Sequence, residues 1–286
     1  MDMKLMKMLF FAMLACLIAQ QLFLSAVAED GSNVINLIVK MESSPQSDGK
    51  SQADRESLEM NTTTNLLNEV DSRKSNVTIS VTGDIANKLY PLYVTMLGTK
   101  NNHELIMGGM SNGEKLASFE DQDARMRKGK KYVEDDYVCG GKQFLVAGYL
   151  PQPGSFNQSG YKIMDDLGLL YLVDDAGLPE SEGKVMPYQM DGFAFYVVPV
   201  SAGSDGRMWD AAAKEAGLNG TQWYDSLVGK FDDASAKGEP LVAVFTNTVS
   251  GSDEYLDAYK KFVEYAADNG ASFVTTKELV ESAKST

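Results

Sequence analysis

The chain has 286 residues and a formal net charge of −14, from 40 acidic and 26 basic side chains. Such an acidic surface argues against nucleic acids and anionic lipids as partners. The length suits one large domain with an ample core, or two small domains.

The amino-terminal segment has the pattern of a secretory signal peptide. Lys4 and Lys7 precede an almost wholly apolar run over residues 8–25, and the Ala-Val-Ala triplet at 26–28 is a small-x-small cleavage signature. We therefore expect residues 1–28 to be removed and the mature protein to be extracellular or associated with the cell envelope. If cleavage failed, the same segment would tether the chain to a membrane by its first helix.

The cysteines and sequons fit an extracellular chain stabilised by its core. Cys16 lies within the predicted signal segment, so Cys139 would be the only mature thiol and no internal disulfide is expected. Four N-x-[ST] sequons are candidate glycosylation sites, at Asn61, Asn76, Asn157 and Asn219.

Hydrophobic periodicity predicts alternating strands and helices in the first half of the mature chain. The predicted strands are 34–41, 77–81, 104–107 and 143–150, and the predicted helices are 57–72, 85–97 and 118–137. The polar stretch 42–57 predicts an exposed loop. The helix over 57–72 is expected to turn Leu58, Leu66, Leu67 and Val70 inward.

The second half continues the alternation. Strands are predicted at 169–173, 193–200, 241–248 and 271–275, and helices at 158–167, 207–216, 221–229, 253–268 and from Thr276 onward. About seven such repeats predict a mostly parallel sheet with helices outside it, either open or closed into a barrel. No linker divides the chain, so residues 29–75 (first strand, polar loop, first helix) and 76–286 (the remainder) are expected to form one domain.

Two long stretches carry a resemblance to a known family. The runs VTISVTGDIANKLYPLYVTMLGTKNNHELIMGGMSNGEKL (77–116) and YLPQPGSFNQSGYKIMDDLGLLYLVDD (149–175), with the ending SFVTTKELVE, resemble the polysaccharide deacetylases of the NodB-homology, carbohydrate esterase type. The resemblance covers roughly residues 34–281. It implies a distorted parallel (β/α) barrel of about seven strands, with an active groove at the carboxyl ends of the strands.

The same resemblance implies a zinc-dependent chemistry whose residues can be sought by position. In the family an aspartate and two histidines hold the metal, and a neighbouring aspartate acts as base. Here Glu42 stands at the position of the base and Ser43 at that of the metal-binding aspartate. Counted from His103, which matches a framework histidine, the two ligand histidines fall on Gly108 and Asn112.

Two further positions of the family pattern are also replaced. Leu150 stands where an arginine would orient the base, and Thr246 stands where a late histidine would protonate the leaving amine. Because His103 is the only histidine of the chain, a monomer cannot build a site with two histidine ligands. We therefore expect no metal cofactor, and Glu42 is at most a remnant base.

Aromatic and loop residues give the candidates for ligand contact. In the resemblance, the loop after the strand that ends near residue 150 borders the barrel mouth, so Tyr149, Pro151, Gly154 and Phe156 are candidate glycan-binding residues. Trp209 and Trp223 lie on helix-like segments, where core packing is the expected role.

Three functions follow from these patterns. The first is a secreted, deacetylase-like protein without metal catalysis that binds glycan or serves cell-envelope carbohydrate metabolism. The second is a glycan hydrolase that uses carboxylates such as Glu42, Asp174 and Asp175. The third is a structural surface protein with a closed groove and no ligand.

Overall fold

The structure is a computed structural model, and it describes residues 33–44, 49–88, 102–135, 145–174, 177–203 and 206–285. The predicted signal segment, Cys139, Asp175 and most of the helix predicted over 85–97 lie outside these residues. Within the described part of the chain, no helix has both the length and the apolar character needed to cross a membrane.

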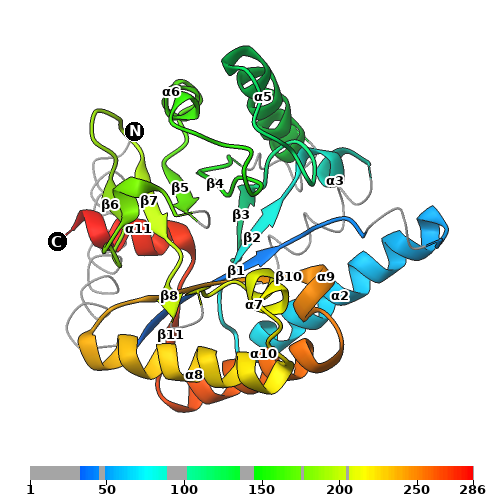
Figure 1. The fold of residues 1–286 in the computed structure, drawn as a ribbon, viewed down its shortest axis with the longest axis vertical. Helices are drawn as coiled ribbons and strands as arrows, with labels where there is room; N and C mark the ends of the chain where they lie inside the picture. The colour runs from blue at the N-terminus through cyan, green and yellow to red at the C-terminus, as the bar shows by residue number, and fades with distance from the viewer. Residues whose placement is uncertain are drawn as a thin grey trace, which may run out of the picture.

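A sheet of nine strands forms the centre of the molecule (Figure 1), in the order β10-β1-β2-β3-β4-β5-β7-β6, with β11 also paired to β1. The strands are β1 (Val34–Lys40), β2 (Thr78–Val81), β3 (Glu104–Met107), β4 (Gly148–Tyr149), β5 (Tyr171–Asp174), β6 (Tyr188–Gln189), β7 (Tyr196–Pro199), β10 (Leu241–Thr246) and β11 (Ser272–Phe273). The seven strands from β10 to β7 pair in parallel, and β6 is antiparallel to β7. The parallel barrel of about seven strands is therefore confirmed.

The barrel closes between β7 and β10 through a short irregular segment. After β7, Ser201 donates its N–H to Val242 O (3.0 Å), and Val244 of β10 donates to Met208 O (2.8 Å). A single parallel bridge joins Trp209 to Val244. The small hairpin of β8 (Ala202–Gly203) and β9 (Gly206–Arg207) lies within this segment. These few contacts replace a continuous strand pair, so the barrel is distorted.

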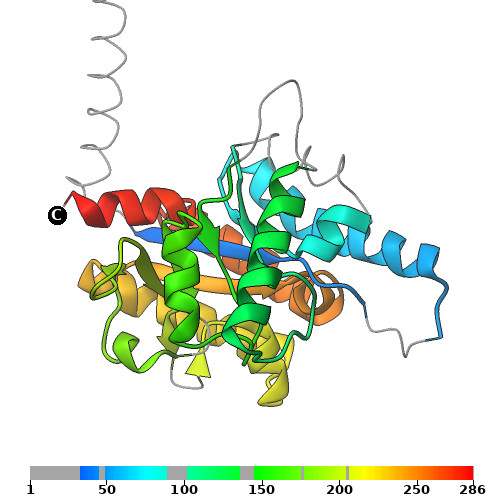
Figure 2. The same cartoon turned by 90° about the horizontal axis from the view of Figure 1, so that it is seen from above.

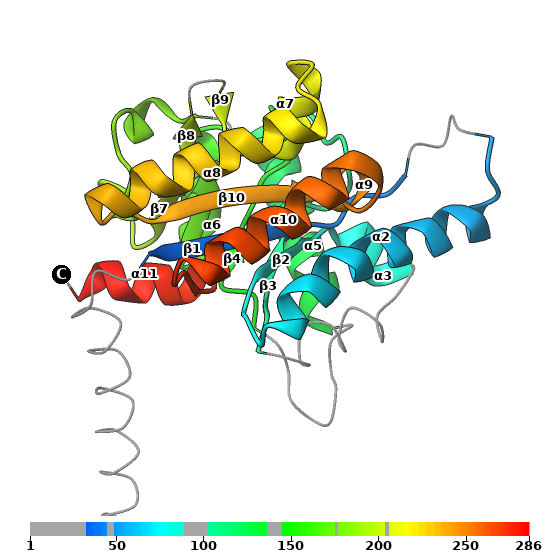
Figure 3. The same ribbon diagram turned by 90° about the horizontal axis from the view of Figure 1, so that it is seen from below.

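Helices cover the outside of the barrel. They are α2 (Gln52–Ser72), α3 (Gly83–Lys88), α5 (Phe119–Asp135), α6 (Ser159–Asp166), η2 (Pro179–Ser181), α7 (Asp210–Glu215), α8 (Gly220–Lys237), α9 (Asn247–Ser250), α10 (Asp253–Asp268) and α11 (Thr276–Lys284). Helix α10 packs between α8 and α2 (Figure 3), and α5 and α6 stand side by side on another flank (Figure 2).

Several predicted boundaries were wrong. Helix α2 begins at Gln52, because Ser51 caps it by accepting the N–H of Asp54, so part of the predicted loop is helical. On α2 the predicted inward residue Leu58 is 37 % exposed, whereas Leu66 is buried. Helix α8 continues to Lys237, well past the predicted end at residue 229, and stops where Gly238 takes a left-handed conformation, φ 67°.

The amino-terminal end of the barrel is filled by polar side chains and the start of α11. Glu104, the first residue of β3, accepts hydrogen bonds from Thr78 Oγ1 (3.1 Å) and from the N–H of Lys277 in the first turn of α11 (2.9 Å). Its other oxygen accepts the hydroxyl of Tyr171, which is fully buried. Thr78 in turn accepts the N–H of Thr276 (2.8 Å). Helix α11 is therefore attached to three strands through one carboxylate.

His103 has a framework role, as the resemblance implies. Its Nδ1 accepts the N–H of Val77 (3.2 Å), so Nε2 carries the proton and donates to Asp71 Oδ1 (2.9 Å). The imidazole links the end of α2 to the start of β2. It lies at the opposite end of the strands from the expected groove.

Candidate functional site

Five residues meet at the carboxyl ends of β1 and β10, and we call them the mouth cluster. They are Lys40, Glu42, Trp209, Thr246 and Asn247. The cluster forms because β1 and β10 are parallel neighbours in a register that sets Lys40 opposite Thr246. Helix α7 begins directly after Trp209, and helix α9 begins at Asn247. Both helices pack against β10 (Figures 1 and 3).

Lys40 is the unusual member of the cluster, because it is a lysine of 1 % exposure at the end of a buried strand. Its Nζ is 2.8 Å from Glu42 Oε1, in an ion-pair contact without hydrogen-bond geometry. The same ammonium lies 5.0 Å from the centroid of the Trp209 ring. Burying an ammonium is costly unless charge partners compensate, and the carboxylate and the ring face provide that compensation.

Backbone and side-chain hydrogen bonds hold the rest of the cluster in place. Asn247 Oδ1 accepts the N–H of Glu42 (2.9 Å), and Trp209 donates its Nε1–H to Thr246 Oγ1 (3.1 Å). The predicted remnant base, Glu42, is therefore fixed at the mouth by both Lys40 and Asn247. The predicted position of the late histidine, Thr246, is fully buried and serves as an acceptor for an indole.

Asp210 lies beneath the cluster as a buried acid. It is fully buried, and its Oδ2 accepts the N–H of Thr246 (2.7 Å). Burial raises the pKa of Asp210 to about 7, although its hydrogen bonds oppose the shift. Its other oxygen, Oδ1, has no hydrogen-bond partner among the described residues.

The position of the first expected zinc histidine, Gly108, is closed to a side chain. A Cβ atom at Gly108 would lie 2.8 Å from Ser80 Oγ and 3.3 Å from the backbone of Val81. The Gly108 carbonyl accepts the amide of Gln152 (2.7 Å), and its N–H donates to Val81 O (2.7 Å). The backbone of β2 and the side chain of Gln152 therefore fill the space around this position.

The other two expected ligand positions offer only neutral groups. Ser43 is exposed after the end of β1, and Asn112 is half-buried in the loop after β3. Asn112 Oδ1 is buried and has no hydrogen-bond partner among the described residues.

Glu114 organises the loop that in the family would carry the zinc histidines. Its Oε1 accepts the N–H groups of Met110 and Ser111, both at 2.9 Å. The start of α3 is bound to the same loop: Gly83 donates its N–H to Gly109 O, and Asp84 donates its N–H to Met110 O. A carboxylate from within the loop thus orders the loop backbone.

Replacing Glu114 with alanine is expected to lower the free energy of unfolding by about 1–2 kcal/mol, because two backbone donors lose a charged acceptor. The amide protons of Met110 and Ser111 should then exchange faster in a hydrogen-exchange measurement. Glu114→Gln keeps one oxygen acceptor and should lose less, and Glu215→Ala, on the exposed end of α7, is the matched control. Unchanged exchange at both amides would contradict this role for Glu114.

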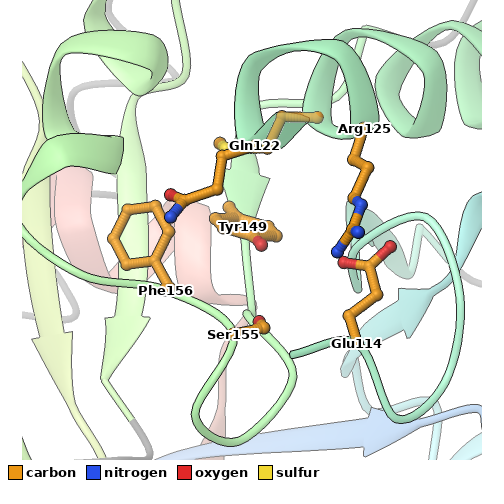
Figure 4. Close-up of a pocket in the computed structure, with 7 residues that line it drawn as sticks. Glu114, Gln122, Arg125, Tyr149, Ser155 and Phe156 are labelled. Atoms are coloured by element: carbon orange, nitrogen blue, oxygen red, sulfur yellow. The ribbon is translucent and has the colours of Figure 1, made fainter. Parts of the chain in front are cut away.

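A narrow cavity lies on the outer side of the sheet, between α5 and the loops after β3 and β4 (Figure 4). It holds about 10 Å³ of water-accessible volume, which is room for about one water molecule. Its lining comprises Glu114, Gln122, Arg125, Met126, Tyr149, Ser155 and Phe156. Tyr149 is 2 % exposed and packs edge-on against Phe156, with ring centroids 5.4 Å apart. The covered ring favours a packing role for Tyr149 over the predicted contact with a ligand.

A second cavity lies between the loop after β4 and the end of β5. Pro151, Gly154 and Phe156 line it together with Asp174 and neighbouring residues, and it holds about 20 Å³ of water-accessible volume. Three of the four predicted ligand-contact residues therefore do share a hollow. Leu150, at the position of the orienting arginine, is fully buried and reaches no solvent.

Asp174, a residue of the carboxylate alternative, is used by the backbone. Its carboxylate accepts the N–H groups of Gly177 (2.8 Å) and Leu178 (2.9 Å). Arg207 Nη2 lies 3.8 Å from Asp174 Oδ2. Asp174 therefore caps a turn and has Arg207 as its charge partner. A carboxylate held in this way is poorly placed to act on a substrate.

The four sequons stand in different surroundings. Asn61, Asn157 and Asn219 are exposed, whereas Asn76 is half-buried beside the fully buried Thr78. Asn219 is used as the N-cap of α8, where its side chain accepts the N–H of Gln222. Asn157 accepts the N–H and hydroxyl of Ser159 (3.1 and 2.6 Å). Their use as glycosylation sites stays a prediction.

The residues present do not fit the zinc site that the family would use. Among the described residues, no group of three or more His, Cys, Asp or Glu side chains is placed to hold a metal ion. The three expected positions contribute a hydroxyl, no side chain and an amide, which are weak zinc donors. In addition, the Lys40 ammonium contacts the carboxylate of the mouth cluster, Glu42.

Sequence reasoning missed the residues that define this site. It assigned no role to Lys40, Asp210 or Asn247, and none to Glu114 or Gln152. One signal was readable: Lys40 is a charged residue at the end of the run VINLIVK, where every other residue but Asn36 is apolar. The other four sit in ordinary polar contexts that carry no such contrast.

Comparison with known proteins places the fold. No family profile matches this sequence, and no curated protein sequence matches it. Among solved structures, the PuuE allantoinase superposes with a TM-score of 0.73 at 15 % identity, covering 90 % of this chain and 92 % of that one. A probable polysaccharide deacetylase from Pseudomonas aeruginosa PAO1 superposes with a TM-score of 0.70 at 14 % identity, covering 88 % and 91 %.

A third similar structure is a pseudoenzyme. It is a CE4-family pseudoenzyme from Bacillus anthracis, with a TM-score of 0.55 at 11 % identity, covering 87 % of this chain and 65 % of that one. At such identities the likeness concerns the course of the chain and not its chemistry. The sequence resemblance is thus confirmed at the level of structure: this chain has the distorted (β/α)-barrel fold of the polysaccharide deacetylases.

Proposed function

We propose that this chain is a secreted, metal-free protein of the deacetylase fold that binds a neutral glycan at the barrel mouth. The observation that carries the proposal is the state of the Gly108 position, where the first zinc histidine would stand. Ser80 Oγ lies 2.8 Å from the place of any Cβ there, and Gln152 holds the carbonyl. Ser80 and Gln152 thus occupy the space that a histidine side chain at position 108 would need.

The charge of the chain specifies the kind of glycan. With a net charge of −14, the protein would repel acidic polysaccharides at long range. Within the mouth, Lys40 and Glu42 form an ion pair whose charges cancel. Neutral or N-acetylated sugars are therefore the class that the charges of this protein suit best. Hydroxyl groups of such a sugar could bond to Glu42 and Ser43, which are the half-exposed and exposed polar residues after β1.

A structural protein without a ligand is the second candidate, and one observation favours it. The two cavities described above hold only about 10 and 20 Å³ of water-accessible volume, far too little to enclose a sugar ring. Glycan binding would have to use an open surface at the mouth. The choice between the two candidates therefore rests on a binding measurement.

The purified chain should be equilibrated with zinc, freed of loose metal and analysed for bound metal, and then applied to an array of neutral, N-acetylated and acidic oligosaccharides. We expect no stoichiometric zinc, no acetate release from N-acetylated oligosaccharides, and binding confined to neutral or N-acetylated sugars. Stoichiometric zinc with deacetylation would refute the metal-free proposal. Absence of all glycan binding would refute the ligand and support the structural candidate.

A further inference from the structure

Lys40 places a fixed positive charge at the end of the barrel where the resemblance expects a metal ion. The side chain is buried to 1 % exposure. Its Nζ contacts Glu42 Oε1 at 2.8 Å and lies 5.0 Å from the centre of the Trp209 ring. A buried ammonium is rare without such partners, and here both partners come from the carboxyl-end loops that border the mouth.

The strand register brings Lys40 next to the position of the first expected zinc ligand. Lys40 pairs with Ser80 on one side and with Thr246 on the other, so the three side chains share one layer and one face of the sheet. Ser80 Oγ in turn adjoins the empty Cβ position of Gly108, at 2.8 Å. The lysine, the serine and the glycine are therefore consecutive neighbours across β1, β2 and the end of β3.

The buried polar atoms of this layer that lack a hydrogen-bond partner among the described residues include three that carry protons, and beneath them one acceptor, Asp210 Oδ1. Lys40 Nζ, Ser80 Oγ and Asn247 Nδ2 have no hydrogen-bond partner among the described residues, and each belongs to a side chain with at most 1 % exposure. An ammonium and an amide N–H₂ cannot ligate a cation, because they offer no lone pair. Such atoms suit a neutral oxygen, that of a water or of a ligand hydroxyl or carbonyl.

We propose that the ammonium of Lys40 is the resident cation of the barrel mouth: by holding Glu42 and repelling a second positive charge, it excludes divalent metal ions from this site. The inference rests on the proposed function in one respect, that the chain is metal-free. It adds the cause. Loss of ligands alone would leave an acidic protein with a free carboxylate at the mouth, whereas Lys40 also removes the attraction.

The test compares metal binding with and without Lys40 in a background where the ligands are restored. That background carries Ser43→Asp, Ser80→Ala, Gly108→His and Asn112→His, the serine being shortened to make room for the imidazole. Zinc affinity is measured by competition with a chromophoric chelator, and the cobalt form by its visible absorption bands. Adding Lys40→Met, which keeps the length of the side chain, is expected to tighten zinc binding at least 100-fold.

Two controls keep the outcome readable. Lys162→Met removes an exposed lysine of α6 and should leave the zinc affinity of the restored background unchanged. A lighter pair with only Ser43→Asp and Asn112→His, with and without Lys40→Met, covers the case in which Gly108→His does not fold. In that pair we expect at least a 10-fold difference.

Equal zinc affinities with and without Lys40, in backgrounds that both fold, would overturn the role of the lysine and leave the proposed function standing. Tight zinc binding by the unaltered chain would instead overturn the metal-free proposal itself. The two failures are therefore distinguishable. A cobalt spectrum of a tetrahedral site that develops only when Lys40 is replaced would support the inference directly.

Discussion

Replacing Glu104 with alanine is expected to lower the free energy of unfolding by about 3–5 kcal/mol, because several hydrogen-bond donors lose their acceptor at once, each at a cost of about 1–3 kcal/mol. The carboxylate accepts hydrogen bonds from Thr78, Tyr171 and the N–H of Lys277. Without it, a fully buried tyrosine hydroxyl and a backbone N–H at the start of α11 both lose their acceptor. Urea denaturation followed by circular dichroism measures the change.

Substitutions that remove only part of this hydrogen-bond network should lower the free energy of unfolding by less. Glu104→Gln retains one oxygen and should cost less than alanine, and Tyr171→Phe should cost about 1–2 kcal/mol, because a single hydrogen bond is lost. A double-mutant cycle between Glu104→Gln and Tyr171→Phe should show coupling. Glu264→Ala on the exposed face of α10 is the matched control. A loss below 1 kcal/mol for Glu104→Ala would show that α11 is held by its apolar contacts alone.

Replacing Asp210 with asparagine is expected to stabilise the protein at neutral and alkaline pH, and much less at acid pH. Burial raises the pKa of Asp210 from 3.8 to about 7. The folded state therefore binds its proton more tightly than the unfolded state, and stability falls as the pH rises between these two values. The effect amounts to about 4 kcal/mol at most. Asparagine has no proton to lose and can still accept the N–H of Thr246.

The measurement is urea denaturation of the two proteins at intervals from about pH 4 to about pH 8. The difference in unfolding free energy between Asp210→Asn and the unaltered chain should grow with pH and level off above the folded pKa. Other carboxyls, such as the half-buried Glu104, titrate in both proteins and cancel in the difference. Asp257→Asn, an exposed residue of α10, should give a flat difference. A flat difference for Asp210→Asn as well would mean that Asp210 keeps an ordinary acidity.

The sequence was a good guide to the parallel strands and a weaker one to what fills the space between them. The alternation of β1, β2, β3 and β10 with helices was legible because buried strands and amphipathic helices have distinct periods. The two-residue strands β4, β6 and β11 were shorter than predicted or not predicted, since pairs this brief depend on neighbouring strands more than on their own residues.

That a monomer cannot supply two histidine ligands was predictable from residue types alone, because the chain has one histidine. The side chains that occupy the expected ligand positions and their surroundings were not predictable. Lys40 meets Trp209 and Glu42 through contacts that span up to 169 residues, and only the closed barrel brings them together. Ser80 fills the space at Gly108 for the same reason: their neighbourhood is a matter of strand register.

The strands that pair with β1 determine when β1 can complete its pairing during folding. This first strand pairs with β10 along one edge and, at its start, with β11 on the opposite edge, and the residues of both follow it by about two hundred positions in the chain. During synthesis the segment VINLIVK must therefore wait, unpaired on the edge that β10 later covers, until almost the whole polypeptide has emerged. Such long-range closure implies slow folding, and a truncation that removed β10, β11 and α11 would leave an exposed apolar edge prone to self-association.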